Sequence, residues 1–353
     1  MTSLHSSHLH DRARAKIVDL AAFLPAQVLS NDALAALYPD WPAARIHDKT
    51  GIRQRHVAAE GETASDLACG AAQALFARGA VSAGEIDFVI LVTQAPDYVL
   101  PSSACLLQHR LGIPRSAGAL DVNLGCSGFV YGLSLAKGLV ETGAARRVLL
   151  LTADTYSKYI HPQDKSVRTL FGDAAVATLV AADEAAPAHA HESIGPFVFG
   201  TDGSGARDLI VEAGGFRRPG DAASACELTD ASGNVRSAGH LYMNGADVFA
   251  FTLREVPQAI DALLDKSGLG RDDVSLYVLH QANRFMLDAL RRKLGLDAAR
   301  MPVCMEDVGN TVSSSIPLAL IALREAGVIP TGARLMLVGF GVGYSWAATL
   351  ITL

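Results

Sequence analysis

Two short stretches decide the expected fold of this 353-residue chain: FVILVTQAP at residues 88–96 and LYVLHQAN at residues 276–283. Each is an apolar run that ends in a polar turn. Three pairs of landmarks are separated by 187 positions: Thr93 and His280, Asn123 and Asn310, and Arg147 and Arg334. Self-similarity at a fixed offset is typical of an internal repeat. The sequence therefore predicts a chain built from two similar halves.

Each half is expected to alternate strands with helices. Apolar residues recur at helical spacing after Cys126 and again after Ser313, namely Phe129, Leu133, Ala136 and Val140, then Ile316, Leu320 and Leu323. Short continuous apolar strands between helices indicate parallel strands that are covered on both faces. We therefore expect an α/β protein in which residues 17–187 and 188–353 pack as α/β/α/β/α layers after a polar tail, residues 1–16. The Gly- and Pro-rich stretch 195–220 is expected to form loops over a site.

Composition excludes several classes of protein. Half of the residues are hydrophobic and 19% are charged, which does not fit a disordered chain. The net charge of −6 and the pI near 6.0 disfavour nucleic-acid binding through bulk charge. No apolar run reaches the roughly 18 residues that a membrane span needs. Residues 1–16 lack the apolar core of a secretory signal.

The positions of the histidines and cysteines indicate whether a metal site or disulfides are expected. His5, His8 and His10 could suggest a metal site, but a mobile polar tail is the simpler interpretation, and we predict no metal. The cysteines are odd in number and contain no C-x-x-C pair: Cys69, Cys105, Cys126, Cys226 and Cys304. This pattern favours reduced thiols and a cytoplasmic protein.

Cys126 is the candidate nucleophile. It lies in DVNLGCSGF at residues 121–129, where a turn of small residues enters the expected helix. The positive end of a helix dipole lowers the pKa of a thiol and favours the thiolate. The flanking Gly125 and Gly128 would let a substrate approach the backbone. A buried structural cysteine is the alternative interpretation.

Three further positions could carry chemistry. His280 ends a strand, where α/β sheets place their sites, although a hydrogen-bonded core histidine would look the same. Asn310 lies in GNTVSSS at residues 309–315, where it could equally cap a helix. The stretch GFGVG at residues 339–343 does not match the dinucleotide fingerprint G-x-G-x-x-G. Its backbone amides could form an oxyanion hole, or the stretch could be a plain tight turn.

Taken in order, these motifs resemble the β-ketoacyl-acyl-carrier-protein synthase III family of the thiolase superfamily. The resemblance runs from about Ile17 to Leu353 and includes KTGIRQR at 49–55, ETASD at 62–66 and FGD at 171–173. It implies a duplicated thiolase-like fold, five-layered α/β/α/β/α with two mixed sheets. It also implies a homodimer that uses no cofactor beyond its acyl thioester substrates.

The resemblance further implies a decarboxylative Claisen condensation. Cys126 would take up an acyl primer as a thioester, and His280 and Asn310 would stabilise the enolate formed when malonyl-acyl-carrier protein loses CO2. The backbone amides of Cys126 and Val342 would form the oxyanion hole. An acyltransferase that moves the acyl group to an oxygen or nitrogen nucleophile is one alternative, and a non-catalytic subunit of a heterodimer is another.

Related chemistries fit the sequence less well. Reversible thiolases carry a second cysteine where this chain has Gly339. Elongating synthases use two histidines, whereas the second position here is Asn310. Chalcone synthase-like enzymes usually have proline at the position of Val342.

The chain departs from the family pattern where the primer binds. The positions of a tryptophan and an arginine that bind coenzyme A hold Arg45 and Lys49, with Trp41 nearby but out of register. A further arginine of that site is matched by Lys165, which lacks the bidentate fork of arginine. Two basic positions at the tunnel mouth are matched by Ala250 and Phe285, although Arg284 adjoins the latter. Delivery of the primer by a carrier protein therefore stays open.

Two expectations concern the acyl chain and the carrier protein. Leu100 and Phe340 are assigned to the acyl pocket, and Leu100 matches a position, often phenylalanine, that closes the pocket of the partner subunit. The smaller leucine predicts a pocket deeper than acetyl requires. The run Arg291, Arg292 and Lys293 is a candidate docking patch for the carrier protein, although it could simply be a solvated helix face.

Overall fold

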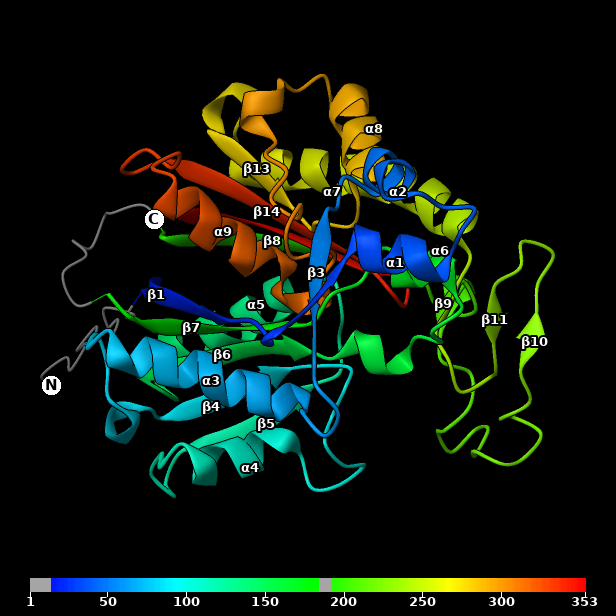
Figure 1. The fold of residues 1–353 in the computed structure, drawn as a ribbon. Helices are drawn as coiled ribbons and strands as arrows, with labels where there is room; N and C mark the ends of the chain where they lie inside the picture. The colour runs from blue at the N-terminus through cyan, green and yellow to red at the C-terminus, as the bar shows by residue number, and fades with distance from the viewer. Residues whose placement is uncertain (1–13, 184–191) are drawn as a thin grey trace, which may run out of the picture.

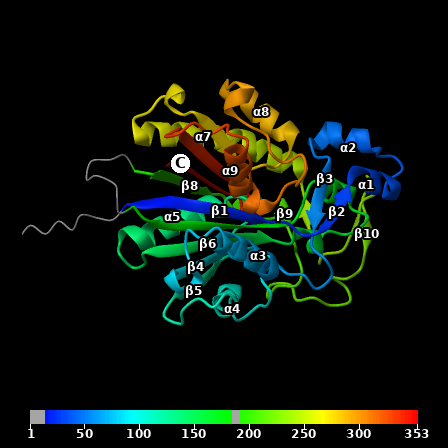
Figure 2. The same ribbon diagram turned by 60° about the vertical axis from the view of Figure 1, so that its left-hand side comes forward.

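The computed structural model describes residues 14–183 and 192–353, which form two stacked sheets with helices between and outside them (Figures 1 and 2). The first sheet has the order β1 (Ala15–Phe23), β7 (Ala174–Ala182), β6 (Arg147–Asp154), β4 (Phe88–Val92) and β5 (Gly118–Val122). The second has the order β8 (Ile194–Thr201), β15 (Ser345–Thr352), β14 (Arg334–Gly341) and β13 (Leu276–Leu279). Both sheets are mixed, because β4 pairs parallel with β5 and β6, β13 pairs parallel with β14, and the remaining pairs are antiparallel.

Six helices complete five layers. The outer layer on the first sheet consists of α3 (Ala64–Ala77) and α4 (Ser103–Arg110). The middle layer consists of α5 (Gly128–Glu141) and α9 (Ser315–Glu325), which contact strands of both sheets. The outer layer on the second sheet consists of α7 (Gly245–Ser267) and α8 (Arg284–Leu294). The predicted duplicated five-layered arrangement with two mixed sheets is confirmed.

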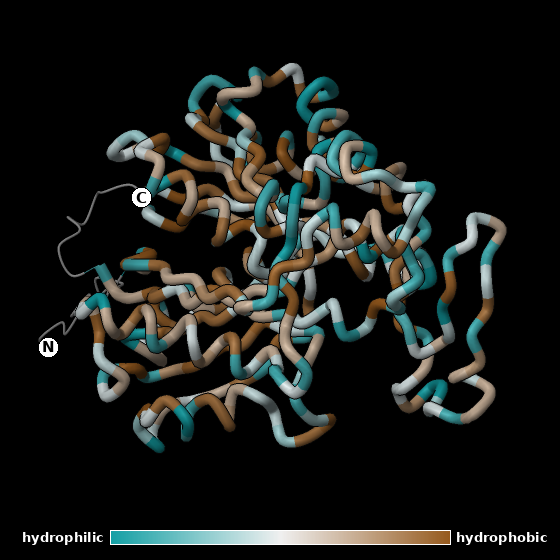
Figure 3. Tube along the Cα trace, viewed as in Figure 1, coloured by the Kyte–Doolittle hydropathy of each residue, from teal (hydrophilic) through white to brown (hydrophobic). Residues whose placement is uncertain are grey.

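The hydrophobic pattern explains the layers. In β4, Ile90 and Val92 pack into the core around the middle helices, whereas Val89 and Leu91 pack under α3 and α4. Side chains of a strand alternate between the faces of its sheet, so a continuously apolar strand is expected where both faces are covered. Figure 3 shows the same distribution, with hydrophobic segments along the central strands and hydrophilic ones in outer loops.

Smaller elements surround the layers on one side. A hairpin of β2 (Gln27–Ser30) and β3 (Gln54–Val57) carries α1 (Asn31–Leu37) and α2 (Ala43–Thr50), and α2 packs beside α8. The remaining elements are α6 (Lys165–Arg168), the pair β9 (Leu209–Ile210) and β12 (Tyr242–Met243), and the pair β10 (Leu228–Thr229) and β11 (Val235–Arg236). No helix within residues 14–183 or 192–353 is long and apolar enough to cross a bilayer.

Two expectations need correction. The stretch 195–220 is not all loop, because β8 occupies its first part. Pro196 concealed this strand, but β8 lies at the edge of its sheet, where a missing backbone N–H is tolerated. Gly200 faces Trp346 so closely that a β-carbon there would lie 2.0 Å from the indole. The halves also differ, since residues 302–305 form no strand equivalent to β5.

The second correction concerns the first domain boundary. The buried Ala15 and its neighbour Lys16, both predicted as tail, belong to β1, where Ala15 pairs with Ala182. His5, His8 and His10, and the predicted boundary between residues 187 and 188, lie outside the described residues.

The middle layer offers a direct test of the fold. Leu133 is fully buried on α5, whereas Leu135 on the same helix is 44% exposed. We expect Leu133→Ala to lower the free energy of unfolding by about 2–5 kcal/mol, because it leaves a cavity between the two sheets. Leu135→Ala should cost no more than about 0.5 kcal/mol. Chemical unfolding measures both, and equal losses would contradict the assignment of α5 to the middle layer.

Candidate active site

Cys126, His280 and Asn310 line one cavity of about 70 Å³. Cys126 lies between β5 and α5, His280 follows β13, and Asn310 precedes the 3₁₀ helix Val312–Ser314. All three residues are buried, with exposures of 5% or less. The thiol comes from the first half of the chain and the imidazole and carboxamide from the second, so the site exists only where the halves meet.

Two glycines of β14 let the halves meet at Cys126. A β-carbon on Gly341 would lie 2.9 Å from Cys126 Sγ, and one on Gly339 would lie 2.7 Å from Ser127 Cα. Contacts below 3.0 Å require the neighbour to move, and here one of the neighbours is backbone. Glycine is therefore needed at both positions for β14 to run directly against the turn that carries the thiol.

The amides proposed as an oxyanion hole surround the sulfur. The backbone N–H groups of Cys126 and Val342 lie close enough to Cys126 Sγ to lower its pKa. Burial and the nearby Asp154 outweigh them and raise the pKa of the thiol to about 12. The expected thiolate, favoured by a helix dipole, is therefore wrong for the unliganded protein: α5 starts two residues later, and loss of hydration disfavours the charged form.

His280 is held as a neutral imidazole. Burial lowers its pKa to about 3. Ser315 Oγ lies 2.6 Å from His280 Nδ1 and accepts the N–H of Gln281 at 3.4 Å. The Ser315 hydroxyl keeps its own proton, and when it donates that proton to Nδ1 the imidazole proton lies on Nε2. His280 is both a hydrogen-bonded core histidine and a residue of the cavity wall.

The carboxamide of Asn310 is oriented by the backbone that follows it. Its Oδ1 accepts the Val312 N–H at 3.0 Å, so its NH2 group is left as the donor. Val312 adopts φ 53°, a left-handed conformation that costs a β-branched residue about 1–3 kcal/mol. The Asn310 backbone also pairs with the first half, through Leu170 and Gly172. Asn310 therefore caps a turn and presents a donor at once.

A buried carboxyl group lies behind the nucleophile. Asp154, at the end of β6, accepts hydrogen bonds from the backbone N–H groups of Gln94 and Ser313 and from the Ser313 hydroxyl. Burial raises the pKa of Asp154 to about 7 despite these donors. The Gln94 side chain accepts the Tyr156 hydroxyl at 2.5 Å. These hydrogen bonds connect loops of both halves beside Cys126.

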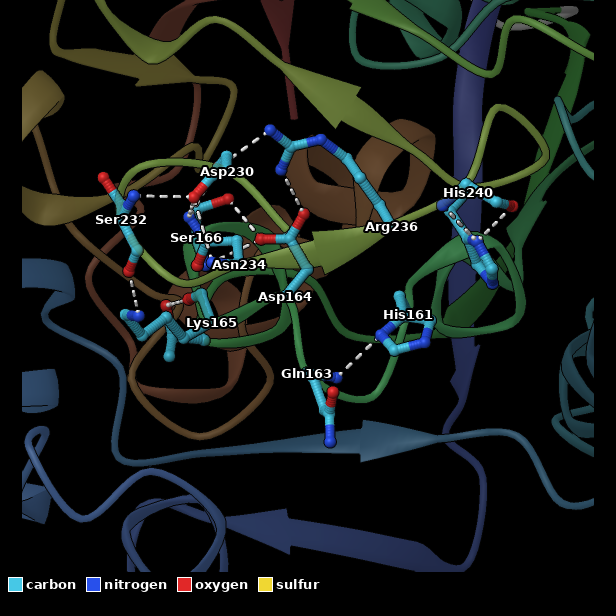
Figure 4. A network of polar contacts seen from close by, with 12 residues as sticks. His161, Gln163, Asp164, Lys165, Ser166, Asp230, Ser232, Asn234, Arg236 and His240 are labelled. Carbon is cyan, nitrogen blue, oxygen red and sulfur yellow. Dashed lines mark hydrogen bonds and ion pairs between the residues drawn. The ribbon is translucent and has the colours of Figure 1, made fainter. Parts of the chain in front are cut away.

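The predicted cationic residues do not line the cavity. Lys49 lies on α2, where its Nζ and the Arg45 guanidinium are 5.4 and 5.1 Å from the Trp41 ring centre. Lys165 donates to the Ser232 carbonyl at 2.6 Å, and Figure 4 shows it held by the β10–β11 hairpin. The hairpin is fastened by Arg236, which bonds Asp164 and Asp230 at 2.8 Å each. Lys165 is thus engaged within its own chain.

The other predicted binding residues fall into two groups. Arg284 begins α8 and packs on Gly51, while Arg292 and Lys293 are exposed at the far end of the same helix. Phe340 lines the catalytic cavity and meets the His280 ring edge-to-face at 5.4 Å. Leu100 is 79% exposed and lies away from that cavity's lining.

Sequence reasoning missed Ser315 and Asp154. Three consecutive serines follow Thr311-Val312, and spacing alone does not tell which of them contacts His280. Asp154 lies 187 positions before Gly341, so the repeat was the signal that could have drawn attention to it. Within the described ranges, no group of three or more His, Cys, Asp or Glu could hold a metal ion.

Comparison with known families supports the resemblance. Residues 120–203 match the family model of 3-oxoacyl-[acyl-carrier-protein] synthase III, and residues 264–353 match the model of its C-terminal part. A β-ketoacyl-[acyl-carrier-protein] synthase III of Rhodospirillum centenum is 35% identical over 341 residues, which cover 96% of this chain and 98% of that protein.

Solved structures agree over the whole chain. A crystal structure of a 3-oxoacyl-(acyl-carrier-protein) synthase III is 66% identical with a TM-score of 0.94, covering 96% of this chain and all of the other. A 3-oxoacyl-(acyl-carrier protein) synthase of Burkholderia xenovorans is 38% identical with a TM-score of 0.87, covering 97% and 95%. With its duplicated halves, its buried cysteine and its His–Asn pair, the chain belongs to the β-ketoacyl-acyl-carrier-protein synthase III family.

Proposed function

We propose that this protein condenses a Cys126-bound acyl primer with malonyl-acyl-carrier protein, giving a β-ketoacyl thioester and CO2. The observation that carries the proposal is the cavity shared by Cys126, His280 and Asn310. A nucleophile and two hydrogen-bond donors for an oxyanion are the groups that this reaction requires. Family membership supports the same chemistry.

The first half-reaction loads the primer. Cys126 Sγ attacks the primer carbonyl, whose oxygen takes the negative charge and is held by the amides of Cys126 and Val342. The old carbon–sulfur bond breaks, and the thiol proton passes to the departing thiolate. Because the pKa of Cys126 is raised to about 12, the thiol is protonated before it attacks. Cys126 therefore supplies the proton that the departing thiolate takes up.

The second half-reaction forms the carbon–carbon bond. The malonyl carboxylate leaves as CO2, and its electron pair forms an enolate whose oxygen is held by Nε2–H of His280 and the NH2 group of Asn310. The enolate carbon attacks the Cys126 thioester, the bond to Sγ breaks, and the released thiolate takes one proton from solvent. Atoms and electrons balance in both half-reactions without a cofactor. We therefore propose that the enzyme uses none.

The assembly belongs to the proposal as well. β5 is an edge strand of the first sheet, and an unpaired edge can pair with a second copy. Residues 98–100, which precede α4, are strongly exposed. We infer a homodimer in which Leu100 closes the pocket of the other copy. The five free thiols support a cytoplasmic location.

Separating the half-reactions tests the proposal and its alternatives. Cys126→Ala should abolish acyl uptake, seen as intact mass, yet still release CO2 from malonyl-carrier protein. His280→Ala should keep acyl uptake and lose CO2 release by roughly a hundredfold or more, as expected when an oxyanion donor is removed. Acyl uptake without any CO2 release in the wild type would favour the acyltransferase. Failure of Cys126 to take up any acyl group would favour the non-catalytic subunit.

The same mass measurement tests the primer. The cavity of about 70 Å³ is lined by residues of one chain only, and Leu100 is not among them. If Leu100 of a second copy leaves a deeper pocket, thioesters from C2 to C10 should include efficient primers longer than acetyl. Strict acetyl preference would overturn that assignment.

Ser315 should matter to decarboxylation alone. Ser315→Ala removes the donor to His280 Nδ1, so the proton is no longer confined to Nε2, and we expect CO2 release to fall roughly tenfold, about 1.4 kcal/mol. Ser315→Thr should restore it. With the pKa of His280 lowered to about 3, neither half-reaction should show a loss between pH 8 and pH 5 from protonation of this imidazole.

The control for Ser315 is its neighbour. The Ser314 hydroxyl bonds Thr152 and the Ala174 carbonyl instead of His280. Ser314→Ala should lower stability without a selective effect on CO2 release. If Ser315→Ala slowed acyl uptake as much as decarboxylation, its contact with His280 would be only structural.

Charge reversal tests carrier docking on α8. Replacing Arg292 and Lys293 by Glu should raise the KM for the carrier protein several-fold and leave kcat nearly unchanged, because rim charges act mainly on association. Added salt should shrink the difference. Lys266→Glu, an exposed lysine on α7, is the matched control. An unchanged KM would remove the docking assignment.

A further inference from the structure

A second cavity shares a wall with the catalytic one. It measures about 260 Å³ and lies between the β2–β3 hairpin and the segment that leads into α6. Phe171 lines both cavities. The backbone of Phe171 also pairs with Asn310 of the catalytic group. Nothing in the condensation described above uses this space.

Arg168 lies on the lining of this cavity. Within residues 14–183 and 192–353, the Arg168 guanidinium takes part in no ion pair, and its Nε is buried without a hydrogen bond. A buried donor left unpaired costs about 1–3 kcal/mol, and more where the group is charged. Arg168 is therefore a donor in need of an acceptor.

A second arginine adds to the positive charge. Arg55 is fully buried, and its terminal nitrogens donate to two backbone carbonyls and to Asn31 Oδ1, none of which is charged. Burial and the neighbouring Arg168 lower the pKa of Arg55 to about 10. The two guanidinium groups thus repel each other, and no carboxylate of the described residues bonds to either.

The remaining lining is amphipathic. Leu29, Ile160 and Phe171 supply apolar walls, and Lys158 adds a cation. The acidic groups are Glu60, on the lining, and Asp173 behind it, whose carboxylate is occupied by the Ala58 and Ser157 amides. Arg55, Lys158 and Arg168 outnumber them, so the site carries a net positive charge.

We propose that this cavity binds a small aliphatic carboxylate, with the carboxylate on Arg168 and the chain against Leu29, Ile160 and Phe171. Arginine pairs with carboxylates through two parallel hydrogen bonds, and the volume suits a ligand of a few carbons. The carboxylate has two possible sources: a free acid, or the far end of a dicarboxylic acyl chain carried by Cys126. The second source rests on the proposed function and requires the chain to pass Phe171, which lines both cavities.

The probe for a free acid is butyrate, titrated calorimetrically into the full-length protein. Binding to the wild type should weaken at least tenfold in Arg168→Gln and in Ala58→Leu, which fills the cavity from a different wall. Arg78→Gln, a partly exposed arginine paired with Asp19, should bind as the wild type does. Arg168→Gln removes an unpaired charge, so its thermal midpoint should not fall. Binding that survives Arg168→Gln would overturn the proposal.

The second source is tested by acyl uptake on Cys126. If butyrate does not bind, glutaryl thioester should load Cys126 in the wild type and at least tenfold less in Arg168→Gln, with butyryl loading equal in both. Butyryl loading reports on the condensing activity independently, so its loss would count against the proposed function instead. If butyrate does not bind and glutaryl loading of Cys126 is the same in Arg168→Gln as in the wild type, the carboxylate site does not exist.

Discussion

The active site depends on a contact between backbones. β14 runs against the turn at Cys126 and Ser127 with no side chain between them, because Gly339 and Gly341 leave no room for one. The Val342 amide reaches Cys126 Sγ only from this position. Side chains then lock the halves together: Ser127 bonds Ser345 at 2.7 Å, and Ser314 bonds Thr152 and the Ala174 carbonyl. Shifting β14 away by the width of one methyl group would separate the nucleophile from the Val342 amide, one of its two oxyanion donors.

Burial then sets the protonation states in the site. Loss of hydration raises the pKa of Cys126 and lowers that of His280, so both groups are neutral near pH 7. Neutral groups suit this chemistry, because a charged imidazole next to a thiolate would form an ion pair that a substrate must break. The donors are fixed before any substrate arrives, by Ser315 on His280 and by Val312 on Asn310. Oriented donors in a buried cavity stabilise an oxyanion without further reorganisation.

The sequence predicted the frame well and the fine positions poorly. Helical spacing after Cys126 and after Ser313 located α5 and α9, and the 187-residue offset located the equivalent strands β4 and β13. Pro196 and Gly200 hid β8, because edge position and packing on Trp346 are tertiary facts. The direction of the Cys126 pKa shift was wrong for a related reason: a helix dipole can be inferred from local sequence, but burial depends on the strands that cover the thiol. The contact of Ser315 with His280 likewise needs coordinates.

The repeat also shows how the two halves differ at the positions that surround the nucleophile. At the 187-residue offset, Cys126 corresponds to Ser313, His280 to Thr93 and Gly341 to Asp154. Gly341 lets the backbone of β14 lie directly against Cys126 Sγ, whereas Asp154 places a carboxylate at the equivalent position, where it accepts the Ser313 hydroxyl and amide. In the first half, the thiol of Cys126 thus faces a cavity. In the second half, the equivalent Ser313 is buried and hydrogen-bonded to Asp154. The hydrogen bonds between Ser313 and Asp154 fix the turn that begins at Asn310. The second half, which has no nucleophile, thereby holds a residue that acts on the substrate of Cys126.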